Sequence, residues 1–395
     1  MSLSITSEPI RTIDGLTSAA NASRSQIPFI LTTTTSQAGK TNFKFEIQIR
    51  NEANTANLIS TIFKYSPKED GTLFLDVGQI MTEYLEKNGL VSVEFKLRFA
   101  QSWTGFSPQV SDSANSYMAV YAQKQIYSDG GANLYNHLFK TGGSGTALTK
   151  WTVPRIYSQW KRTIGILYDG QFTSTIQIQY LYRDKSVISS NAATTIPATN
   201  GVQNLDLQNY AVAIPSNAYW VRANFGTKLN SVDYKVTRDC KNPIFIEYLN
   251  SLGAYEQHLF DIKQEVKVST STGISSSRAI NEDYSSVRVT NIRVANDWIQ
   301  EIICETDQLS NDDLQAIAEI KRSTSVRVLL TRDGSKFVQV VVTNNFSDTF
   351  STDNANNNFQ LQIQMPNNFN VFDAINYELT PSQAHLNVAF TAAYN

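Results

Sequence analysis

Hydrophobic and polar residues alternate along several segments of this chain, with the two-residue period of a β-strand that buries one face. The clearest case is residues 43–49, where Phe43, Phe45, Ile47 and Ile49 share one side of the predicted strand. The same alternation recurs in residues 91–99, 172–180, 326–330, 337–341 and 359–363. Each of these segments is therefore predicted to be a strand with one face in a core.

Turn signals between these segments predict how the strands are joined. Residues 326–330 and 337–341 flank a polar stretch that contains Asp333 and Gly334. Because an Asp-Gly pair tolerates positive φ, the two segments predict a β-hairpin. Elsewhere, strand signals recur at short spacing with Gly, Asn, Asp and Ser between them, which favours antiparallel sheets. The predicted fold class is all-β, mainly strands with a few short helices, in tandem antiparallel β-sandwich or barrel domains.

Two segments have helical rather than strand periodicity. Residues 76–88 place apolar side chains on one helical face, with Asp76 at the N-cap and Gly89 just past the end. Residues 311–321 show the same spacing over a shorter length. Both segments predict short helices that pack on sheets.

Stretches of small and polar residues divide the patterned segments. Residues 141–145, 191–201 and 269–277 are too polar to bury and predict loops or linkers. The first 25 residues lack periodicity and predict an extended arm. The predicted organisation is therefore an N-terminal arm, two β-sandwich domains, and a C-terminal β domain with a short helix and a hairpin. Their expected bounds are 1–25, 26–149, 150–265 and 266–395.

Composition and charge narrow the classes of function. The chain has 395 residues, enough for two to three domains and more than one core. Charged residues make up 17%, below the average of about 25% for globular domains. With 33 Lys and Arg against 35 Asp and Glu, the net charge is -2, whereas nucleic-acid binders carry a basic excess. We therefore expect no sequence-specific nucleic-acid partner.

No segment predicts a membrane partner or secretion. No run approaches the ~20 apolar residues of a membrane helix. The first 15 residues lack the basic and apolar regions of a signal peptide. We therefore expect no membrane association and folding in a reducing cytoplasm.

Residues that could form a metal or cofactor site are few and scattered. Cys240 and Cys304 belong to no CxxC motif, and small buried hydrophobes are the interpretation that their number favours. His137, His258 and His385 lie far apart and in no HxH or HxxxH pattern, whereas zinc ligands come at short spacing. No metal site and no cofactor is predicted.

Acidic residues are the remaining source of possible catalysis. The densest cluster contains Glu301, Glu305, Asp307 and the pair Asp312–Asp313. Two carboxylates about 5–10 Å apart could hydrolyse a glycosidic bond, which keeps a β-fold glycosidase open as an alternative. Acids at a helix start, favoured by the helix dipole, are the other explanation. Calcium binding there lacks its usual loop motif, and GxSxG is absent. No catalytic residue is predicted.

One segment, residues 150–162, interleaves aromatic and basic side chains. It contains Trp151, Arg155, Tyr157, Trp160 and Arg162. Such residues can pack in a core, anchor a subunit interface or stack on a ligand, and all three interpretations stay open. We name the five as candidate interface residues.

The order of several longer motifs resembles one family across most of the chain. NFKFEIQIR at residues 42–50 is followed by GTLFLDVGQIMTEYLEK at 71–87. CKNPIFIEYLNSLGAYEQHLF follows at residues 240–260 and NDWIQEIICETDQLSNDDL at 296–314. This order resembles the large virion proteins of tailed phages that infect Bacteroidetes, crAss-like relatives included.

The resemblance is most specific around the family pattern wLNxLGGwdyxxF. Ala254 replaces its second glycine, and Tyr248 replaces the tryptophan that precedes its leucine. Trp298 stands at a second family segment, WLxxLl, with Ile299 in place of leucine. The positions that match the first pattern are Leu249, Asn250, Leu252, Gly253, Tyr255 and Phe260.

From the residues alone, the Asn250 segment predicts a corner of packed sheet. Ile244 to Leu249 form an apolar strand, and Tyr255 and Phe260 return to a core. Gly253 allows close backbone approach, and Asn250 has no acid or histidine beside it. We therefore expect Asn250 to cap backbone groups rather than to catalyse.

The resemblance implies a non-enzymatic structural subunit of the virion, built from β-sandwich domains and made in the bacterial host cytoplasm. Its implied place is the tail, the baseplate or the neck ring. Its expected partners are other copies of itself in a ring and neighbouring tail or connector proteins. Two alternatives remain: a carbohydrate-binding or receptor-binding adhesion module at a tail tip, and the β-fold glycosidase.

Overall fold

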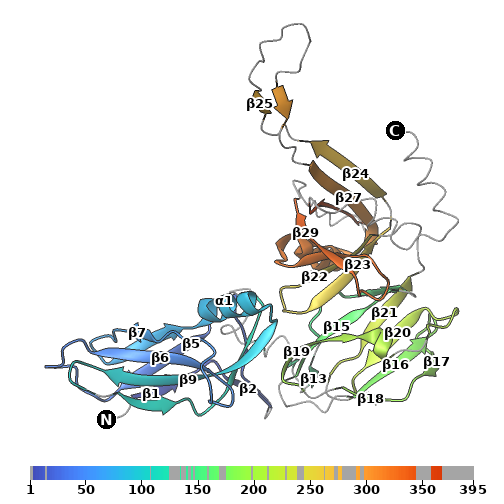
Figure 1. Cartoon of the computed structure of the whole chain (residues 1–395). Coiled ribbons are helices and arrows are strands. Elements are labelled where there is room, and N and C mark those ends of the chain that lie inside the picture. Colours follow the sequence, from blue (N-terminus) through green and yellow to red (C-terminus); the bar gives the residue numbers. More distant parts are fainter. Residues whose placement is uncertain are drawn as a thin grey trace, which may run out of the picture. The chain divides into compact units, whose positions relative to one another are not determined.

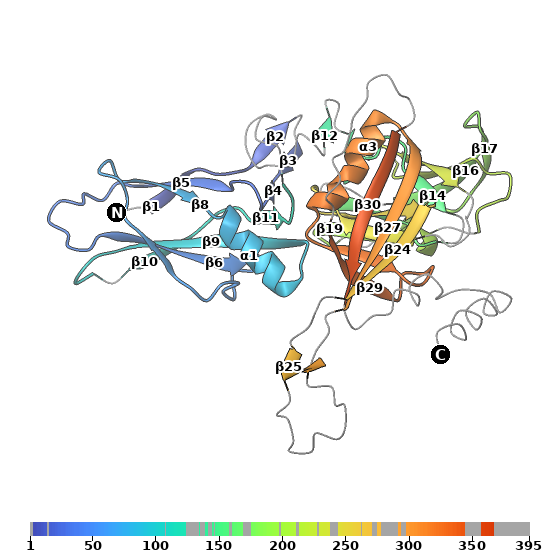
Figure 2. The same ribbon diagram turned by 90° about the horizontal axis from the view of Figure 1, so that it is seen from above.

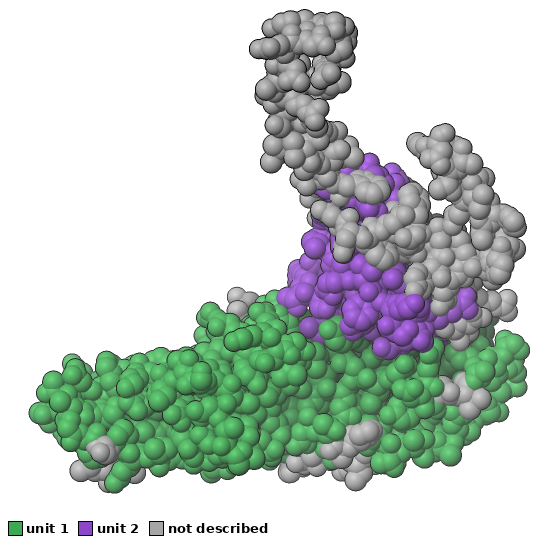
Figure 3. Space-filling model, in the orientation of Figure 1, with its two compact units in different colours: residues 1–149, 162–236, 250–256 green, residues 150–161, 237–249, 257–395 purple. Residues whose placement is uncertain are grey.

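The computed structural model forms two compact units, each assembled from three separate segments of the chain. Unit 1 comprises residues 1–149, 162–236 and 250–256, and unit 2 comprises residues 150–161, 237–249 and 257–395 (Figure 3). The structure describes residues 3–13, 16–106, 108–123, 134, 139–140, 144–145, 147–157, 160–168, 175–196, 199–210, 213–226, 229–237, 244–261, 263–270, 275–277, 291–293, 298–343 and 357–366.

The first part of unit 1 is a sandwich of two sheets (Figure 1). One sheet has the order β1-β5-β8, with strands β1 (Leu3–Ser7), β5 (Pro28–Thr33) and β8 (Thr72–Asp76). The other has the order β4-β11-β9-β6-β7, and β10 also pairs with β9. Its strands are β4 (Ala20–Ala22), β6 (Lys44–Asn51), β7 (Phe63–Tyr65), β9 (Ser92–Ser102), β10 (Gln109–Asp112) and β11 (Tyr117–Val120).

The alternating residues of the predicted strands fill the space between these sheets. Phe45, Ile47 and Ile49 of β6 are all buried. The rings of Phe29 and Tyr117 meet edge to face across the sheets, with centroids 4.8 Å apart. The predicted strand period is therefore confirmed here, because each buried residue is followed by a more exposed one.

The N-terminal segment differs from the predicted arm, because residues 3–22 contribute strands to unit 1. β1 pairs antiparallel with β5, and β4 pairs in parallel with β11. The short strands β2 (Arg11–Ile13) and β3 (Leu16–Ser18) pair with each other. In β1 and β4, Leu3 is the only large apolar side chain that is buried, and the other buried apolar residues are small alanines. The segment therefore has too few large hydrophobic residues to show the two-residue period of a strand.

Helix α1 (Gly78–Asn88) confirms the first helix prediction with a small shift at its start. Val77 occupies the N-cap position. Asp76 still satisfies the helix start, because its Oδ1 accepts hydrogen bonds from the backbone N–H groups of Gly78 and Ile27, both at 2.9 Å. Gly89 ends the helix with a φ of 62°, as predicted.

The second part of unit 1, which we call the second sandwich, contains two further sheets. The larger has the order β21-β20-β16-β17, with β18 also paired to β16, and β15 pairs with β19 along six residues. Between these sheets, the guanidinium of Arg162 lies over the ring of Tyr234. The strands are β15 (Thr163–Tyr168), β16 (Thr175–Leu181), β17 (Val187–Ser190), β18 (Thr194–Thr195), β19 (Gly201–Asp206), β20 (Trp220–Asn224) and β21 (Val232–Thr237).

Unit 2 is a seven-stranded antiparallel sheet that curves around one helix (Figure 2). Its order is β23-β22-β28-β29-β30-β27-β24, and helix α3 (Asn311–Ala318) packs against it, followed by the turn η2 (Glu319–Arg322). The strands are β22 (Ile244–Leu249), β23 (Tyr255–Phe260), β24 (Lys263–Thr270), β27 (Trp298–Leu309), β28 (Val326–Leu329), β29 (Phe337–Val342) and β30 (Asn357–Met365).

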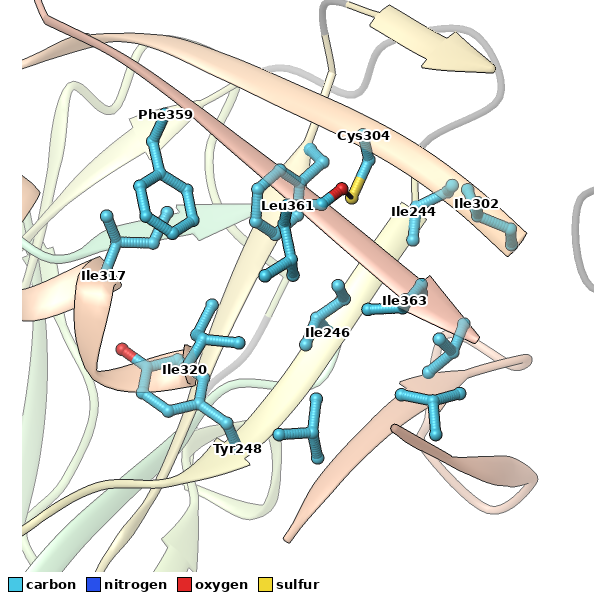
Figure 4. Close-up of a cluster of buried hydrophobic side chains, with 14 of the residues drawn as sticks. Ile244, Ile246, Tyr248, Ile302, Cys304, Ile317, Ile320, Phe359, Leu361 and Ile363 are labelled. Carbon is cyan, nitrogen blue, oxygen red and sulfur yellow. Dashed lines mark hydrogen bonds between the residues drawn. The ribbon is translucent and has the colours of Figure 1, made fainter. Parts of the chain in front are cut away.

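One hydrophobic core holds the sheet of unit 2 to its helix (Figure 4). Phe359, Leu361 and Ile363 alternate along β30 and point into this core, as the sequence predicted. Ile246 of β22 and Ile317 of α3 pack from the other sides. The core therefore joins elements that are far apart in the sequence.

The helix and the hairpin predicted for this region are both confirmed. Ser310 caps α3, because its Oγ accepts a hydrogen bond from the backbone N–H of Asp313 at 3.1 Å. β28 and β29 form the predicted hairpin, with Val326 opposite Val340. Gly334 in the connecting turn has a φ of 69°. The helix ends at Ala318, three residues earlier than predicted.

Short strands also lie within or beside the stretches predicted to be loops. β12 (Phe139–Lys140) pairs with β13 (Ser144–Gly145), and β25 (Ser275–Ser277) pairs with β26 (Asn291–Arg293). The remaining elements are β14 (Arg155–Tyr157) and the turn η1 (Leu207–Asn209).

The predicted all-β fold class is confirmed, but the predicted domain bounds differ from the two units. The expected boundary after residue 149 coincides with an end of a unit 1 segment. The expected boundary at residue 266 falls inside β24. Residues 150–265 are shared between the units because β22 is an interior strand of the unit 2 sheet, between β23 and β28, which composition along the chain could not indicate.

Candidate functional site

The segment between β22 and β23 forms a tight turn, which we call the Asn250 turn (residues 250–256). The backbone N–H of Asn250 donates to the carbonyl oxygen of Ala254 at 2.8 Å, and that of Gly253 donates to the carbonyl oxygen of Asn250 at 3.1 Å. The buried strand β22 precedes the turn, and the mostly buried strand β23 follows it, so both ends of the turn are fixed. The predicted corner of packed sheet is therefore present.

The side chain of Asn250 is buried, and three hydrogen bonds engage it. Its Nδ2 donates to the carbonyl oxygen of Leu148 at 2.8 Å. Its Oδ1 accepts from the backbone N–H groups of Leu252 and Ala254, both at 3.0 Å. These contacts confirm the predicted backbone-capping role, because both ends of the amide bind the chain itself.

Gly253 brings the turn close to the first sandwich of unit 1. Its φ is 85°, a region that residues with a Cβ atom rarely adopt. A Cβ atom at this position would lie 2.7 Å from Cγ1 of Val120 and 3.2 Å from the carbonyl oxygen of Tyr121. Both reasons for a glycine, the conformation and the close approach, therefore hold.

Other residues of the turn contact both sandwiches of unit 1. The backbone N–H of Gln123 donates to the carbonyl oxygen of Ser251 at 2.8 Å. The backbone N–H of Tyr255 donates to Oδ1 of Asn204 at 2.9 Å. The turn thus joins the first sandwich to the second through one backbone–backbone hydrogen bond and one hydrogen bond to an asparagine side chain, and this position makes it a structural junction.

The last two motif residues lie in unit 2. Phe260 is fully buried, and its ring lies near those of His258 and Phe359, with centroids 5.1 and 6.3 Å away. Trp298 begins β27, where its backbone pairs with Thr270, and its side chain lies outside the described residues. Phe260 therefore has a packing role.

The three large aromatic residues of the basic segment pack inside unit 2. Trp151, Tyr157 and Trp160 are only 6%, 2% and 8% exposed. The Trp151 ring stacks on His258 with centroids 5.2 Å apart, and its Nε1 donates to the Tyr248 hydroxyl at 3.1 Å. Side chains buried within one chain leave little surface for a partner. The structure therefore favours the core interpretation over the subunit-interface and ligand-stacking interpretations for all three.

The two arginines of that segment differ in burial and belong to different units. Arg155 begins β14 and is half-buried. Arg162 belongs to unit 1 and is buried, with its guanidinium 5.1 Å from the ring centroid of Tyr234. Burial raises the pKa of Tyr234 to about 12, although the neighbouring Arg162 opposes the shift. The five predicted interface residues therefore do not form a single exposed patch.

The acidic residues considered for glycoside hydrolysis are arranged along β27 and α3. Glu301 and Glu305 lie four residues apart on one strand, so their Cα atoms are about 13 Å apart. Glu301 accepts a hydrogen bond from Thr343 and Glu305 accepts one from Asn358. Asp313 lies in the first turn of α3, as the helix-start explanation predicted. This Cα separation is larger than the roughly 5–10 Å between the two carboxyl groups of a glycosidase.

The described residues hold no group of three or more His, Cys, Asp or Glu side chains arranged for a metal ion. His258 is buried, and its Nε2 lies 3.2 Å from the hydroxyl of Thr306. Cys304 is a buried free thiol whose pKa burial raises. His137, His385 and Cys240 lie outside the part of the chain that the structure describes.

A buried ion pair in unit 2 went unpredicted. Glu247 is almost fully buried on β22, and its carboxylate accepts hydrogen bonds from Arg327 and, at 2.6 Å, from Gln257. The Nζ of Lys161 lies 4.0 Å away. Within the strand pattern, Glu247 stands between buried hydrophobic residues, which was the only signal in the sequence.

A second unpredicted cluster gathers aromatic and basic residues on the second sandwich. The rings of Tyr219 and Trp220 lie 5.3 Å apart, with Arg183 over the first and Lys185 over the second. Lys185 and Arg222 also pair with Asp233, and these pairs hold the pKa of Asp233 below its ordinary value. The nearby motifs YRDK and YWVR contain the signal that could have found it.

Comparison with known proteins finds distant structural similarity and no family. Neither the protein-family models nor the curated proteins include a match to this chain. Among solved structures, a tetra-tandem repeat from the extending region of a large adhesion protein is 12% identical, covers 77% of this chain and 69% of its own, and has a TM-score of 0.23.

Two other solved structures are similar at the same low level. The periplasmic chaperone SfaE is 10% identical over 60% of this chain and 100% of its own, with a TM-score of 0.19. A chimeric titin Z1Z2 tandem is 12% identical with the same two coverages and a TM-score of 0.15. At such scores these similarities carry no argument about function. No helix in the described part is long and apolar enough to cross a bilayer.

Proposed function

We propose that this chain is a non-enzymatic structural subunit of a phage virion, assembled as a ring in the tail, baseplate or neck. The observation that carries the proposal is the Asn250 turn. Two of the matched positions of the virion-like motif (residues 249–260) that lie in it, Asn250 and Gly253, are engaged in capping and close packing. Such a motif serves the architecture of a subunit and requires no reaction.

One face of the second sandwich carries three half-buried amide side chains beside an arginine that pairs with Asp233, and these amides support the same proposal. Gln177 and Gln179 of β16 lie opposite Asn224 and Arg222 of β20 in the sheet register. All four side chains are half-buried and face away from the hydrophobic side of this sheet. A neighbouring subunit can cover amides with hydrogen bonds at a lower desolvation cost than charges would impose.

Quantitative mass spectrometry of purified particles encoded by the same genome tests this proposal. We expect the chain in several copies per particle, retained through washing and density-gradient purification. If the chain is absent from the particles, or is washed away like a contaminating host protein, the proposal is wrong.

The Tyr219–Trp220 cluster favours a second candidate, a carbohydrate-binding or receptor-binding module. An aromatic ring offers its apolar face to a ligand, and Tyr182 beside the cluster is 44% exposed. Trp220→Ala should abolish binding to a glycan array, whereas Phe74→Ala, at another exposed aromatic residue, should not. If the wild-type chain binds no glycan on the array, this second candidate function is wrong.

A further inference from the structure

β24 is an edge strand of the unit 2 sheet. Among the strands that the structure describes, its one neighbour is β27, and β24 is the last strand in the sheet order. Figure 2 shows β30, β27 and β24 side by side. The pairing runs without a break from Lys263 opposite Glu305 to Thr270 opposite Trp298. A regular eight-residue edge with no proline or bulge is a template for a further strand.

The side chains near the middle of β24 alternate between charge and apolar character. Glu265 and Lys267 share one face, with side chains 45% and 53% exposed, and their charged groups lie 4.0 Å apart. Val266 points to the other face and packs against the core of unit 2. Val268 follows on that face and is 44% exposed. The edge therefore combines two opposite charges with an apolar stripe.

This pattern is self-complementary in one orientation. When two β24 strands pair antiparallel with Val266 opposite Val266, Glu265 of each copy lies opposite Lys267 of the other. Opposite charges at directly facing positions stabilise a strand pair, and like charges destabilise it. We propose that β24 pairs with β24 of a second copy of this chain in this register, so that one sheet continues through both copies.

Competing arrangements of the same two strands are less favourable. Parallel in-register pairing places Glu265 opposite Glu265 and Lys267 opposite Lys267. An antiparallel register centred on Glu265 also brings two like carboxylates together. The register centred on Val266 avoids these repulsions and covers two partly exposed apolar positions, Val266 and Val268, with the edge of the other copy.

The contact has two-fold symmetry, because the same strand contributes from both sides. It is independent of the virion assignment, since it needs only two copies of the chain. Within a ring it would join copies in pairs and would not by itself close the ring, which requires head-to-tail contacts. A failure of the β24 contact would therefore leave the proposed function standing.

Charge exchange on the full-length chain tests the contact. Sedimentation velocity over a wide range of concentration should show a reversible wild-type dimer. Glu265→Lys and Lys267→Glu should each weaken it by about tenfold or more, because each turns two attractive pairs into repulsive ones. The double variant should return the dissociation constant to within about threefold of wild type. A wild-type chain that stays monomeric, or single variants that associate unchanged, would overturn the proposal.

A cysteine scan tests the register itself. The Val266→Cys variant should form a disulfide-linked dimer under mild oxidation, because position 266 faces its own copy at a distance suited to a disulfide. Val268→Cys is the matched control: the two 268 positions lie four residues apart along the paired strands, and no cross-link should form. The wild-type chain controls for Cys240. No cross-link in the Val266→Cys variant, or equal cross-linking in both variants, contradicts this register.

Discussion

The methyl group of Ala254 occupies the space that Gly165 leaves open on β15. A Cβ atom at Gly165 would lie only 2.1 Å from the Cβ atom of Ala254, where an ordinary contact needs at least 3.4 Å. Ala254 stands where the virion-like motif has its second glycine. The Asn250 turn and the second sandwich of unit 1 therefore fit together through one small residue on each side.

Gly165→Ala should lower the free energy of unfolding by about 1–3 kcal/mol, because the added methyl group overpacks this contact. Ala254→Gly in the same chain should recover most of the loss by removing the opposing methyl group. Urea unfolding of the two single variants and the double variant gives the coupling energy. Additive effects would show that the two residues do not share the contact.

Asn250→Ala should cost about 2–4 kcal/mol of stability. The substitution leaves the carbonyl oxygen of Leu148 and two backbone N–H groups without their amide partner in a buried site. Asn217→Ala, at an exposed asparagine, is the control and should change stability little. Equal stability of the two variants in chemical denaturation would contradict the capping role.

Trp151→Ala should destabilise the protein by about 3–5 kcal/mol, because it empties a buried site and removes the stacking on His258. Trp220→Ala, at a half-buried tryptophan, should cost less. Thermal unfolding compares the two. If Trp151→Ala left stability unchanged but reduced self-association, the interface interpretation would replace the core interpretation.

Glu94 should make stability depend on pH in the acid range. Burial raises its pKa above 4.5, the like charge of Glu52 adds to the shift, and a hydrogen bond from Asn200 opposes it. The folded state therefore holds this proton more tightly than the unfolded state, so the stability that Glu94 contributes falls as pH rises from about 4.5 through its folded pKa.

Glu94→Gln should remove that slope and stabilise the protein at pH 7, since its amide oxygen still accepts from Asn200. Glu69→Gln on the exposed surface is the control. Urea unfolding measured between pH 4 and pH 7 compares the two variants with wild type. An unchanged slope for Glu94→Gln would show that this carboxyl group is not the source.

Local patterns predicted the elements well where one face of a strand or helix is solvated. The alternation along β6, β9 and β30 predicted these strands, and Gly89 and Gly334 marked a helix end and a turn. β15 has no such alternation, because five of its six residues are buried, and it was missed. The N-terminal strands were missed because they bury mostly small side chains.

The roles of single residues were predictable to the extent that they depend on the local chain. Capping by Asn250 follows from the turn chemistry of its own segment. The burial of Trp151 does not, because His258 and Tyr248, which cover it, come from strands distant in the sequence. Residues 150–265 are divided between two units for the same reason. The strand order of the unit 2 sheet depends on pairing between strands that are far apart in the sequence.

Electron cryomicroscopy of purified particles can show whether this chain is a structural subunit that forms a ring in the virion. We expect a rotationally symmetric ring on the tail axis, into which repeated copies of units 1 and 2 fit as separate bodies. A reconstruction in which every axial ring is filled by other proteins, with no density for this chain, would contradict it.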